Sequence, residues 1–376
     1  MKNTTMLLWL LLWIIALSWC SISNDQINKI TNEDNQSDQI LSNIYTWDNM
    51  IDTWANHTNI YTDDRMTLAL AAPRSSDKYY ASRYDDIMEF IVWYAKAIIW
   101  HDNVVIFVDD KAYNVLSKEL PEDILIKYPQ QDIWMRDFST TNPNNPIQWV
   151  YTDTAQWWKQ SDSDYVQSNF NKRLSPKYEI QKTILKMDWW NIVDNYNWDI
   201  IVSDRFLEDN NLSYKEWIAK LKDILWAKRV AIIANDDPDW LAHADGMVAW
   251  IDDKVLAINI YEEPLRTKII DEIKKQFPDV KIIEVEAKFD DTVRDSKISS
   301  ACGINLNAVL TKNYIYMPDF GTAHDQDVLV QIQSNTSKKV IPISASSVCS
   351  MWWSVRCLTR QTHWDLAKIV LESTNK

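Results

Sequence analysis

One arrangement of secondary structure recurs along this chain and restricts its fold more than any other feature. From about residue 67 onward, apolar runs of strand length alternate with stretches of helical spacing, in the order strand, strand, helix, strand. The clearest copy comprises strands at 247–251 and 255–260, a helix at 264–276 and a strand at 280–285. A supersecondary unit that recurs at a steady period predicts a ring or a solenoid of repeats.

The number of copies predicts the fold class. We expect an α/β fold of about five ββαβ units arranged around a pseudo-fivefold axis, and the alternative is an ordinary three-layer α/β sheet. No linker rich in Pro or Ser divides the sequence after residue 45, so residues 46–376 are expected to form one domain. A chain of 376 residues is long enough to bury the core that such a domain needs.

The chain contains only 3 Gly but 21 Trp, which conflicts with a fold rich in turns. Average glycine usage of about 7% predicts about 26 glycines in a chain of this length, and only Gly adopts a positive φ freely. Pairs such as Trp189-Trp190 and Trp352-Trp353 stand where the backbone is expected to need Gly. We hypothesise that many of these codons are UGA, which some bacterial lineages read as Gly; Trp134 and Trp250 fit genuine Trp. The alternative is a protein that is truly rich in Trp.

The amino terminus, residues 1–20, has the pattern of an export signal. One positive charge precedes an apolar run over residues 6–17, which is shorter than a membrane-spanning helix requires. The segment ends in Leu17-Ser18-Trp19-Cys20, which resembles a bacterial lipobox when Gly stands at position 19, so Cys20 is expected to be lipidated. Residues 21–45, rich in Asn, Asp, Gln and Ser, are expected to be a flexible tether. A plain cleaved signal peptide and a membrane anchor are the alternatives, and all three predict an exported protein that meets the membrane only through this segment.

Charge and cysteine content narrow the classes of function. A formal net charge of -14 argues against nucleic-acid binding, and it favours cationic substrates or simply aids solubility. No Cys/His cluster has metal-ligand spacing, so no metal site is expected. If Cys20 carries a lipid, three cysteines remain, and pairing Cys302 with Cys349 would leave Cys357 as a free thiol. The sequence leaves open whether that pair forms.

Five short motifs carry the candidate chemistry, and successive motifs lie about 50–60 residues apart. Each motif lies near the start of one repeat, and equivalent positions in a ring of repeats converge on its axis. We therefore expect the five motifs to share one pocket. They are Trp134-Met135-Arg136-Asp137, Asp188-Trp189-Trp190-Asn191, His243-Ala244-Asp245-Gly246, Asn305-Leu306-Asn307 and Trp352-Trp353-Ser354-Val355-Arg356-Cys357.

A pocket built from these motifs offers a thiol, an imidazole and several carboxylates. Carboxylates repel an anionic substrate and bind a planar cation such as guanidinium through paired, charge-assisted hydrogen bonds. The guanidinium carbon is electrophilic but resonance-stabilised, so its hydrolysis requires a nucleophile and a proton donor for the departing ammonia. Taken singly, Cys357 is also typical of a buried small hydrophobic residue, and Asp137 beside Arg136 is typical of a structural ion pair. Their ordered occurrence together favours a catalytic site.

The motifs resemble those of the agmatine deiminase and bacterial peptidyl-arginine deiminase family. Residues 132–138 contain its Trp-Met-Arg-Asp signature, and residues 243–246 are similar to its His-x-Asp motif. With Gly in place of the paired Trp, residues 188–191 resemble its acidic-Gly-Gly-Asn element, and residues 352–361 resemble its glycine-rich segment around the nucleophilic Cys. The resemblance extends from about residue 67 to the C-terminus. It implies a five-bladed α/β propeller, the pentein fold, with residues 46–376 as the deiminase catalytic domain.

The resemblance also implies a role for each candidate residue. Cys357 would be the nucleophile, and His243 would be the general acid and base. The carboxylates of Asp137 and Asp245 would hold the guanidinium group. The expected substrate-binding residues are Asp188, where the family often has Glu, Asn307, with Asn305 as the alternative register, Trp134 and Arg136.

The implied reaction is hydrolysis of a guanidino group through an amidino-thioether on Cys357, without a metal or an organic cofactor. Agmatine would give N-carbamoylputrescine and ammonia, a step of putrescine and polyamine biosynthesis, and peptidyl-arginine would give citrulline. The expected partner is therefore a small cationic guanidino substrate or an arginyl peptide, and Lys159 is the one suggestion for a group that selects free arginine. The alternatives are an amidinotransferase of the same fold and a non-catalytic surface lipoprotein that binds arginine-like ligands. The sequence leaves open whether the protein forms a homo-oligomer.

Overall fold

The computed structural model describes residues 57–138, 147–151, 160–172, 180–187, 189–236, 243–289, 300–351, 354–362 and 364–374. The chain divides into two units, Met1–Thr46 and Trp47–Lys376, and every described residue lies in the second unit. The predicted signal peptide, the lipidated Cys20 and the tether lie outside the described residues. Within the described ranges, no helix is long and apolar enough to span a membrane.

The predicted repeat is seen most clearly in one three-stranded sheet. Strand β9 (Val248–Asp252) pairs antiparallel with β10 (Val255–Asn259), and β10 pairs parallel with β11 (Lys281–Val285). Helix α10 (Leu265–Gln276) connects β10 to β11, since parallel neighbours need a crossover connection. The order is the predicted ββαβ, and the bounds agree with the sequence-based ones to within a residue.

Two further sheets repeat this topology, with an antiparallel first pair and a parallel second pair. One consists of β6 (Val193–Asp194), β7 (Asp199–Ser203), α7 (Arg205–Asn210), α8 (Tyr214–Leu225) and β8 (Arg229–Ile233). The other consists of β12 (Val309–Leu310), β13 (Tyr314–Asp319), α11 (Ala323–Gln333) and β14 (Lys339–Ser344). Residues 302–303 and 305–306 form turns, so β12 contains only Val309 and Leu310.

A fourth sheet joins segments from opposite ends of the described chain. Strand β15 (Arg360–Thr362) pairs antiparallel with β1 (Thr67–Ala71), and β1 pairs parallel with β2 (Asn103–Phe107). Helix α3 (Tyr84–Ile98) connects β1 to β2, and β3 (Leu125–Ile126) extends the sheet. Strand β15 thus takes the place that β6, β9 and β12 hold in their own sheets. The sequence did not predict it, because Arg-Gln-Thr carries no apolar pattern.

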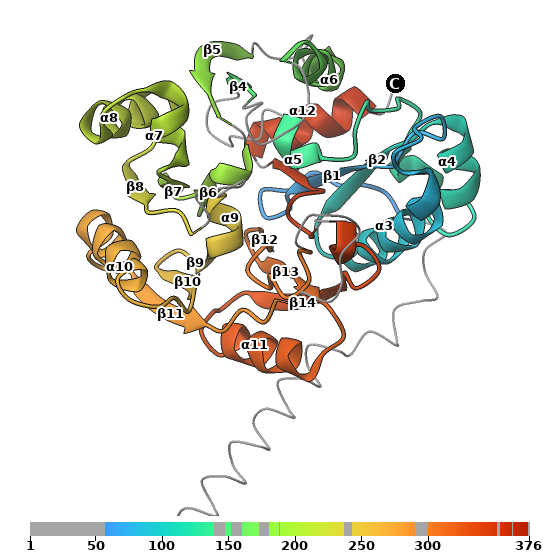
Figure 1. Ribbon diagram of the computed structural model, residues 1–376. Helices are drawn as coiled ribbons and strands as arrows, with labels where there is room; N and C mark the ends of the chain where they lie inside the picture. Colours follow the sequence, from blue (N-terminus) through green and yellow to red (C-terminus); the bar gives the residue numbers. More distant parts are fainter. Residues whose placement is uncertain are drawn as a thin grey trace, which may run out of the picture. The chain divides into compact units, whose positions relative to one another are not determined.

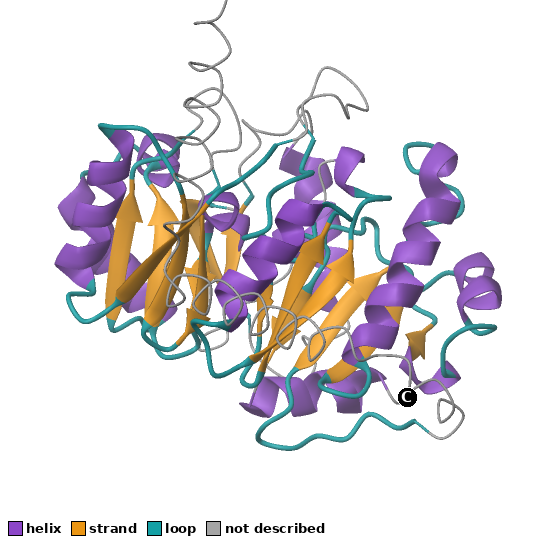
Figure 2. Cartoon of the chain, turned by 90° about the horizontal axis from the view of Figure 1, so that it is seen from below, coloured by secondary structure: helices purple, strands orange, loops and turns teal. Residues whose placement is uncertain are grey.

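The fifth sheet consists, over the described residues, of the parallel strands β4 (Ile147–Val150) and β5 (Gln181–Lys186), with α6 (Gln160–Lys172) between them in the chain. Figure 1 shows the five sheets in chain order around a common centre, with most helices toward the outside. Figure 2 shows helices flanking the sheets. The described strands therefore form five small sheets instead of the single open sheet of the alternative prediction. Helix α4 (Asp110–Leu116) lies between β2 and β3 in the chain, and α12 (Trp364–Thr374) follows β15.

The core of the molecule connects the outer helices to the segments that carry the candidate site. Helix α3 buries Ile87, Ile91, Tyr94 and Ile98 at helical spacing, and it packs against both β2 and β14. Each buried side chain of this size stabilises the fold by about 1.5–3 kcal/mol. The same apolar cluster includes residues of β12 and of the loop before β15, namely Val309, Val355 and Leu358. Packing of α3 therefore fixes the backbone on either side of Cys357.

Two Trp residues adopt a backbone conformation that favours Gly. Trp226 directly follows α8 with a φ of 53°, and Trp198 has a φ of 71° in the turn between β6 and β7. Helices commonly end on a left-handed residue, which is usually Gly, and any other L-residue there costs about 1–2 kcal/mol. Both positions support the hypothesis that some Trp codons of this chain encode Gly.

Candidate active site

Three of the predicted motifs lie at the starts of the first strands of their sheets. Asp245 belongs to α9 (Ala244–Met247), a single turn that leads directly into β9. Asn307 lies just before β12, and Cys357 lies just before β15. Because these strands occupy equivalent places in sheets around one centre, side chains from distant parts of the sequence meet there.

A chain of hydrogen bonds joins Cys357, Asn307 and Asp245, all of which are buried. The Cys357 thiol donates to Asn307 Oδ1 over 3.3 Å, and Asn307 Nδ2 donates to Asp245 Oδ2 over 3.0 Å. Asn307 Oδ1 also accepts from the backbone N–H of Arg356 at 3.1 Å and from that of Cys357 at 3.4 Å. Asn307 therefore holds the predicted nucleophile and one predicted guanidinium-binding carboxylate in a fixed relation.

The two candidate Asn residues have different surroundings. Asn305 Nδ2 donates to Asp325 Oδ1 at 2.6 Å and to the Pro318 carbonyl at 3.3 Å. Asp325 in turn accepts from the backbone N–H of Thr322 at the start of α11. Asn305 thus fixes the connection between β13 and α11, and Asn307 is the one of the two that contacts Cys357.

Arg356 is a buried residue of the site that the sequence reasoning did not single out. Its Nη1 donates to Asp245 Oδ2 over 2.9 Å, and its Nη2 donates to the Ile192 carbonyl over 2.5 Å. Its side chain thereby connects the segment before β6 with α9. The one sequence signal for Arg356 was its position directly before the predicted nucleophile. Its contacts cross between repeats, and such contacts leave no pattern in a sequence.

The Trp-Met-Arg-Asp motif forms the short helix α5 (Met135–Phe138) beside the Cys357 backbone. The backbone N–H of Arg136 donates to the Cys357 carbonyl at 3.2 Å, and the Tyr151 hydroxyl donates to Asp137 Oδ2 at 2.9 Å. The Arg136 guanidinium donates to Gln361 in β15, and burial followed by the charge of Arg356 lowers the pKa of Arg136 to about 10. Asp137 thus lies close enough to act electrostatically on the thiol. The side chain of Arg136, in contrast, is bonded to β15.

The electrostatic surroundings favour the neutral form of the thiol. Burial is the largest cause that raises the pKa of Cys357 above its ordinary range, and the negative charges of Asp245 and Asp137 raise it further. A backbone hydrogen bond at Ser354 and the positive charge of Arg356 act in the opposite direction. A cation placed between the two carboxylates would therefore favour ionisation of the thiol.

His243 lies directly before α9, as its N-cap residue, and is mostly buried. Its ring meets the Trp190 ring edge-on, with 4.8 Å between ring centroids, and Trp190 stacks on Trp134 at 4.6 Å. Asn191 Oδ1 accepts from the backbone N–H of Ala244 at 3.2 Å, which ties the short helix η4 (Trp189–Asn191) to the turn that follows His243. Asp188 lies outside the described residues.

Comparison with known proteins is consistent with this geometry. The family model of the Porphyromonas-type peptidyl-arginine deiminase matches residues 61–362. The chain belongs to this family. The resemblance predicted from the four motifs is therefore confirmed.

Solved deiminase structures share the fold of this family member. The agmatine deiminase of C. jejuni has a TM-score of 0.67 at 17% identity, and the match covers 81% of this chain and 96% of that chain. The agmatine deiminase of Enterococcus faecalis has a TM-score of 0.64 at 15% identity, over 82% of this chain and 95% of that chain. At such identities the likeness shows the fold, which is mixed α/β and pentein-like. Comparison with curated proteins gives no match.

A disulfide joins two segments of the candidate site. Cys302 and Cys349 are bonded, and the backbone N–H of Ala301 donates to the Cys349 carbonyl at 2.9 Å. The first loop continues to Asn307, and the second continues to Cys357. Among the described cysteines, Cys357 is thus the one with a free thiol.

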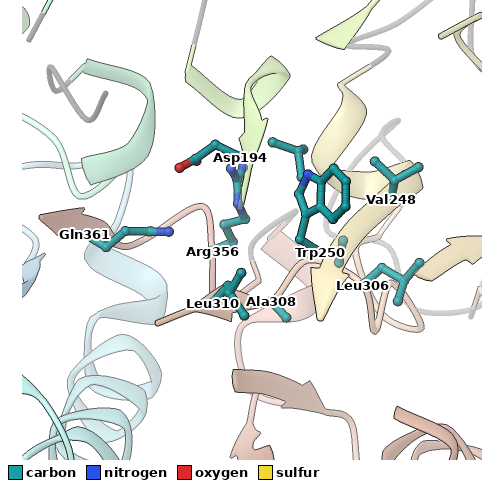
Figure 3. A pocket seen from close by; sticks show the side chains of 10 residues that line it. Asp194, Val248, Trp250, Leu306, Ala308, Leu310, Arg356 and Gln361 are labelled. Atoms are coloured by element: carbon teal, nitrogen blue, oxygen red, sulfur yellow. The ribbon is translucent and has the colours of Figure 1, made fainter. Parts of the chain in front are cut away.

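A cavity is lined in part by the side chain of Arg356. Figure 3 shows Asp194, Arg356 and Gln361 as its polar side chains, with Trp250 across from Gln361. Its walls come from the first strands β6, β9, β12 and β15 and from the residues before them. The lining residues are Val193, Asp194, Val248, Ala249, Trp250, Leu306, Ala308, Leu310, Arg356 and Gln361. Over the described part of the chain, no group of His, Cys, Asp and Glu is arranged to hold a metal ion.

Proposed function

We propose that this deiminase-family protein hydrolyses a guanidino group through covalent catalysis by Cys357. The observation that carries the proposal is the buried assembly of Cys357, Asn307 and Asp245, with Asp137 acting on the same thiol. Two carboxylates beside a thiol bind a planar cation and reject an anion. The substrate class is a guanidine on a flexible chain, either agmatine or the side chain of a peptidyl-arginine, and the products are the ureido compound and ammonia.

The first step is binding of the cation between Asp137 and Asp245. Its positive charge offsets the two negative charges that disfavour the Cys357 thiolate, so substrate binding and activation of the nucleophile are coupled. The thiol proton passes to His243, and the thiolate adds to the guanidinium carbon. The role of His243 is carried over from the family motif and stays a prediction.

The later steps return the enzyme to its starting state. The carbon–nitrogen bond to the leaving amino group breaks, and His243 delivers the proton so that ammonia departs. An amidino-thioether on Cys357 remains. His243 then takes a proton from water, which adds to the same carbon, and the carbon–sulfur bond breaks to release the ureido product and the thiol.

The decisive experiment measures ammonia and ureido product from agmatine, free arginine and an arginyl peptide, using the gene with the suspected UGA codons read as Gly. Wild type is expected to turn over at least one of these substrates, and Cys357→Ser is expected to be inactive while its circular dichroism matches wild type. A Cys357→Ser variant as active as wild type would refute the mechanism. Transfer of the amidino group to an added amine would establish an amidinotransferase instead. Binding without any product would indicate a non-catalytic arginine-binding protein.

We further propose that the protein is exported and anchored through a lipid on Cys20. The lipobox-like sequence motivates this proposal, and a disulfide between Cys302 and Cys349 is typical of an oxidising compartment outside the cytoplasm. We also propose that the five sheets close into the five-bladed propeller implied by the family. Metabolic labelling with a clickable fatty acid tests the anchor: wild type should be labelled and Cys20→Ala should not, and equal labelling of both would contradict it.

A further inference from the structure

The side chain of Arg356 forms a buried junction between the site and the cavity shown in Figure 3. Only 4% of the residue is exposed, yet its guanidinium reaches two acceptors on different repeats, Asp245 Oδ2 and the Ile192 carbonyl. Its backbone N–H donates to Asn307 Oδ1, the same oxygen that accepts from the Cys357 thiol. One residue therefore contacts the carboxylate and the Asn that define the site.

The contacts of Asp245 are uneven across its two oxygens. Within the described residues, both hydrogen bonds given to this carboxylate, from Arg356 Nη1 and Asn307 Nδ2, fall on Oδ2. Two donors on one oxygen fix the orientation of the carboxylate plane. Neither of these two bonds falls on Oδ1, the oxygen that we expect to accept from a ligand.

Arg356 also changes the balance of charge at the thiol. Cys357 faces the carboxylates of Asp245 on α9 and of Asp137 on α5, and His243 precedes α9. The positive charge of Arg356, in the same loop as Cys357, opposes the effect of these carboxylates on the thiol. The guanidinium of Arg136 instead donates a hydrogen bond to Gln361 of β15. The carboxylate of Asp194 lines the same cavity as Arg356.

We propose that Arg356 is a positioning residue of the deiminase site: it orients Asp245 for guanidinium binding and supplies the internal positive charge that makes the Cys357 thiol reactive. The first half of this inference rests on the proposed function. The second half concerns the thiol alone, so it can be tested in a protein without any known substrate.

The two acceptors of Arg356, Asp245 Oδ2 and the Ile192 carbonyl, require a side chain with two donor nitrogens. Arg can donate from Nη1 and Nη2 to two acceptors at once in a fixed plane, whereas Lys offers the same charge from a single nitrogen. Arg356→Lys therefore separates charge from orientation, and Arg356→Met removes both while keeping a long apolar stem. Arg229→Met is the matched control, because Arg229 also makes a two-pronged contact with a carboxylate, that of Asp199, on the β7–β8 sheet.

The experiment follows two readouts on the purified full-length protein. The first is the rate of alkylation of Cys357 by iodoacetamide between about pH 6 and pH 10, a range chosen to span the ordinary thiol pKa, measured by mass spectrometry of the peptide that contains Cys357. The second is kcat and KM for the substrate found to be turned over. Arg356→Met is expected to shift the alkylation profile to higher pH and to lower kcat/KM roughly 10- to 150-fold, the range for one hydrogen bond to a charged group.

The variants distinguish the outcomes. Arg356→Lys is expected to keep an alkylation profile close to wild type, since the charge remains, but to raise KM because Asp245 loses its fixed orientation. Arg229→Met should leave both readouts unchanged. An Arg356→Met profile that superimposes on wild type would overturn the proposal. If Arg356→Met does not fold, an Arg356→Lys variant with wild-type KM overturns the orienting role.

The two proposals fail in different ways. A shifted alkylation profile in Arg356→Met, together with no turnover by wild type, would support the action of Arg356 on the thiol and refute the deiminase function. Turnover by wild type with no response of either readout to Arg356 would refute the positioning role and leave the deiminase function standing.

Discussion

Removal of the disulfide is expected to weaken the fold and the site by separate routes. Replacing Cys302 and Cys349 with Ala opens a covalent loop whose ends lie 47 residues apart in sequence. In the chain-entropy description, a cross-link over a loop of this length stabilises the folded state by about 4 kcal/mol, because it restricts the unfolded chain. The free energy of unfolding of the double variant should fall by about that amount.

The same bond connects the loop that carries Asn307 to the loop that carries Cys357. Without it, the thiol and its Asn partner are held together by hydrogen bonds and packing alone, and small displacements of reacting groups are costly for catalysis. We expect kcat/KM to fall roughly 10- to 100-fold even where the variant is fully folded. Wild type treated with a reductant should approach the same values.

The assay combines urea unfolding, followed by circular dichroism and linear extrapolation, with turnover measured well below the midpoint of unfolding. The double variant should be insensitive to added reductant, which controls for effects of the reagent on Cys357. A loss of stability below about 1 kcal/mol would contradict the loop argument, which predicts several times more. An unchanged kcat/KM in a destabilised variant would refute the claim that the disulfide positions the site.

Three further perturbations test other parts of the structure. Trp226→Gly should raise the free energy of unfolding by about 1 kcal/mol in urea titrations, because it relieves a left-handed backbone, and a decrease would count against the recoding hypothesis. Burial lowers the pKa of His101 to about 4, so the unfolded state binds more protons, and stability present above about pH 6.5 is lost as the pH falls toward 4. Between pH 6.5 and pH 4 the melting temperature of His101→Leu should therefore fall less than that of wild type. An equal fall in melting temperature for both proteins would contradict this. Asn307→Ala should lower kcat with little change in melting temperature, whereas Asn305→Ala should lower the melting temperature with little change in kcat; the reverse pattern would exchange their roles.

Much of the fold could be predicted because its units repeat and because apolar spacing marks each strand and helix. The unit at β9, β10, α10 and β11 was found to within a residue for this reason. Strand β15 was missed, since its three residues carry no apolar alternation and its partner β1 lies almost 300 residues earlier. Pairing over such a distance leaves no local signal in a sequence.

The site was predictable where a motif marks a chemical group and not where a contact crosses between repeats. Cys357, Asn307 and Asp245 were placed together from their spacing, and the structure joins them by hydrogen bonds. Arg356 and Tyr151 were not found. Their importance depends on which side chain lies opposite them, and that is decided by the arrangement of the sheets rather than by neighbours in the sequence.

The pairing of β15 with β1 brings together segments that are made at opposite ends of synthesis. Cys357, the proposed nucleophile, lies just before β15, and Asp245 and Asn307 come from segments made earlier in synthesis. The hydrogen bond between Cys357 and Asn307 cannot form before the segment that leads into β15 has been synthesised. Any chemistry that depends on Cys357 must therefore await synthesis of almost the whole domain.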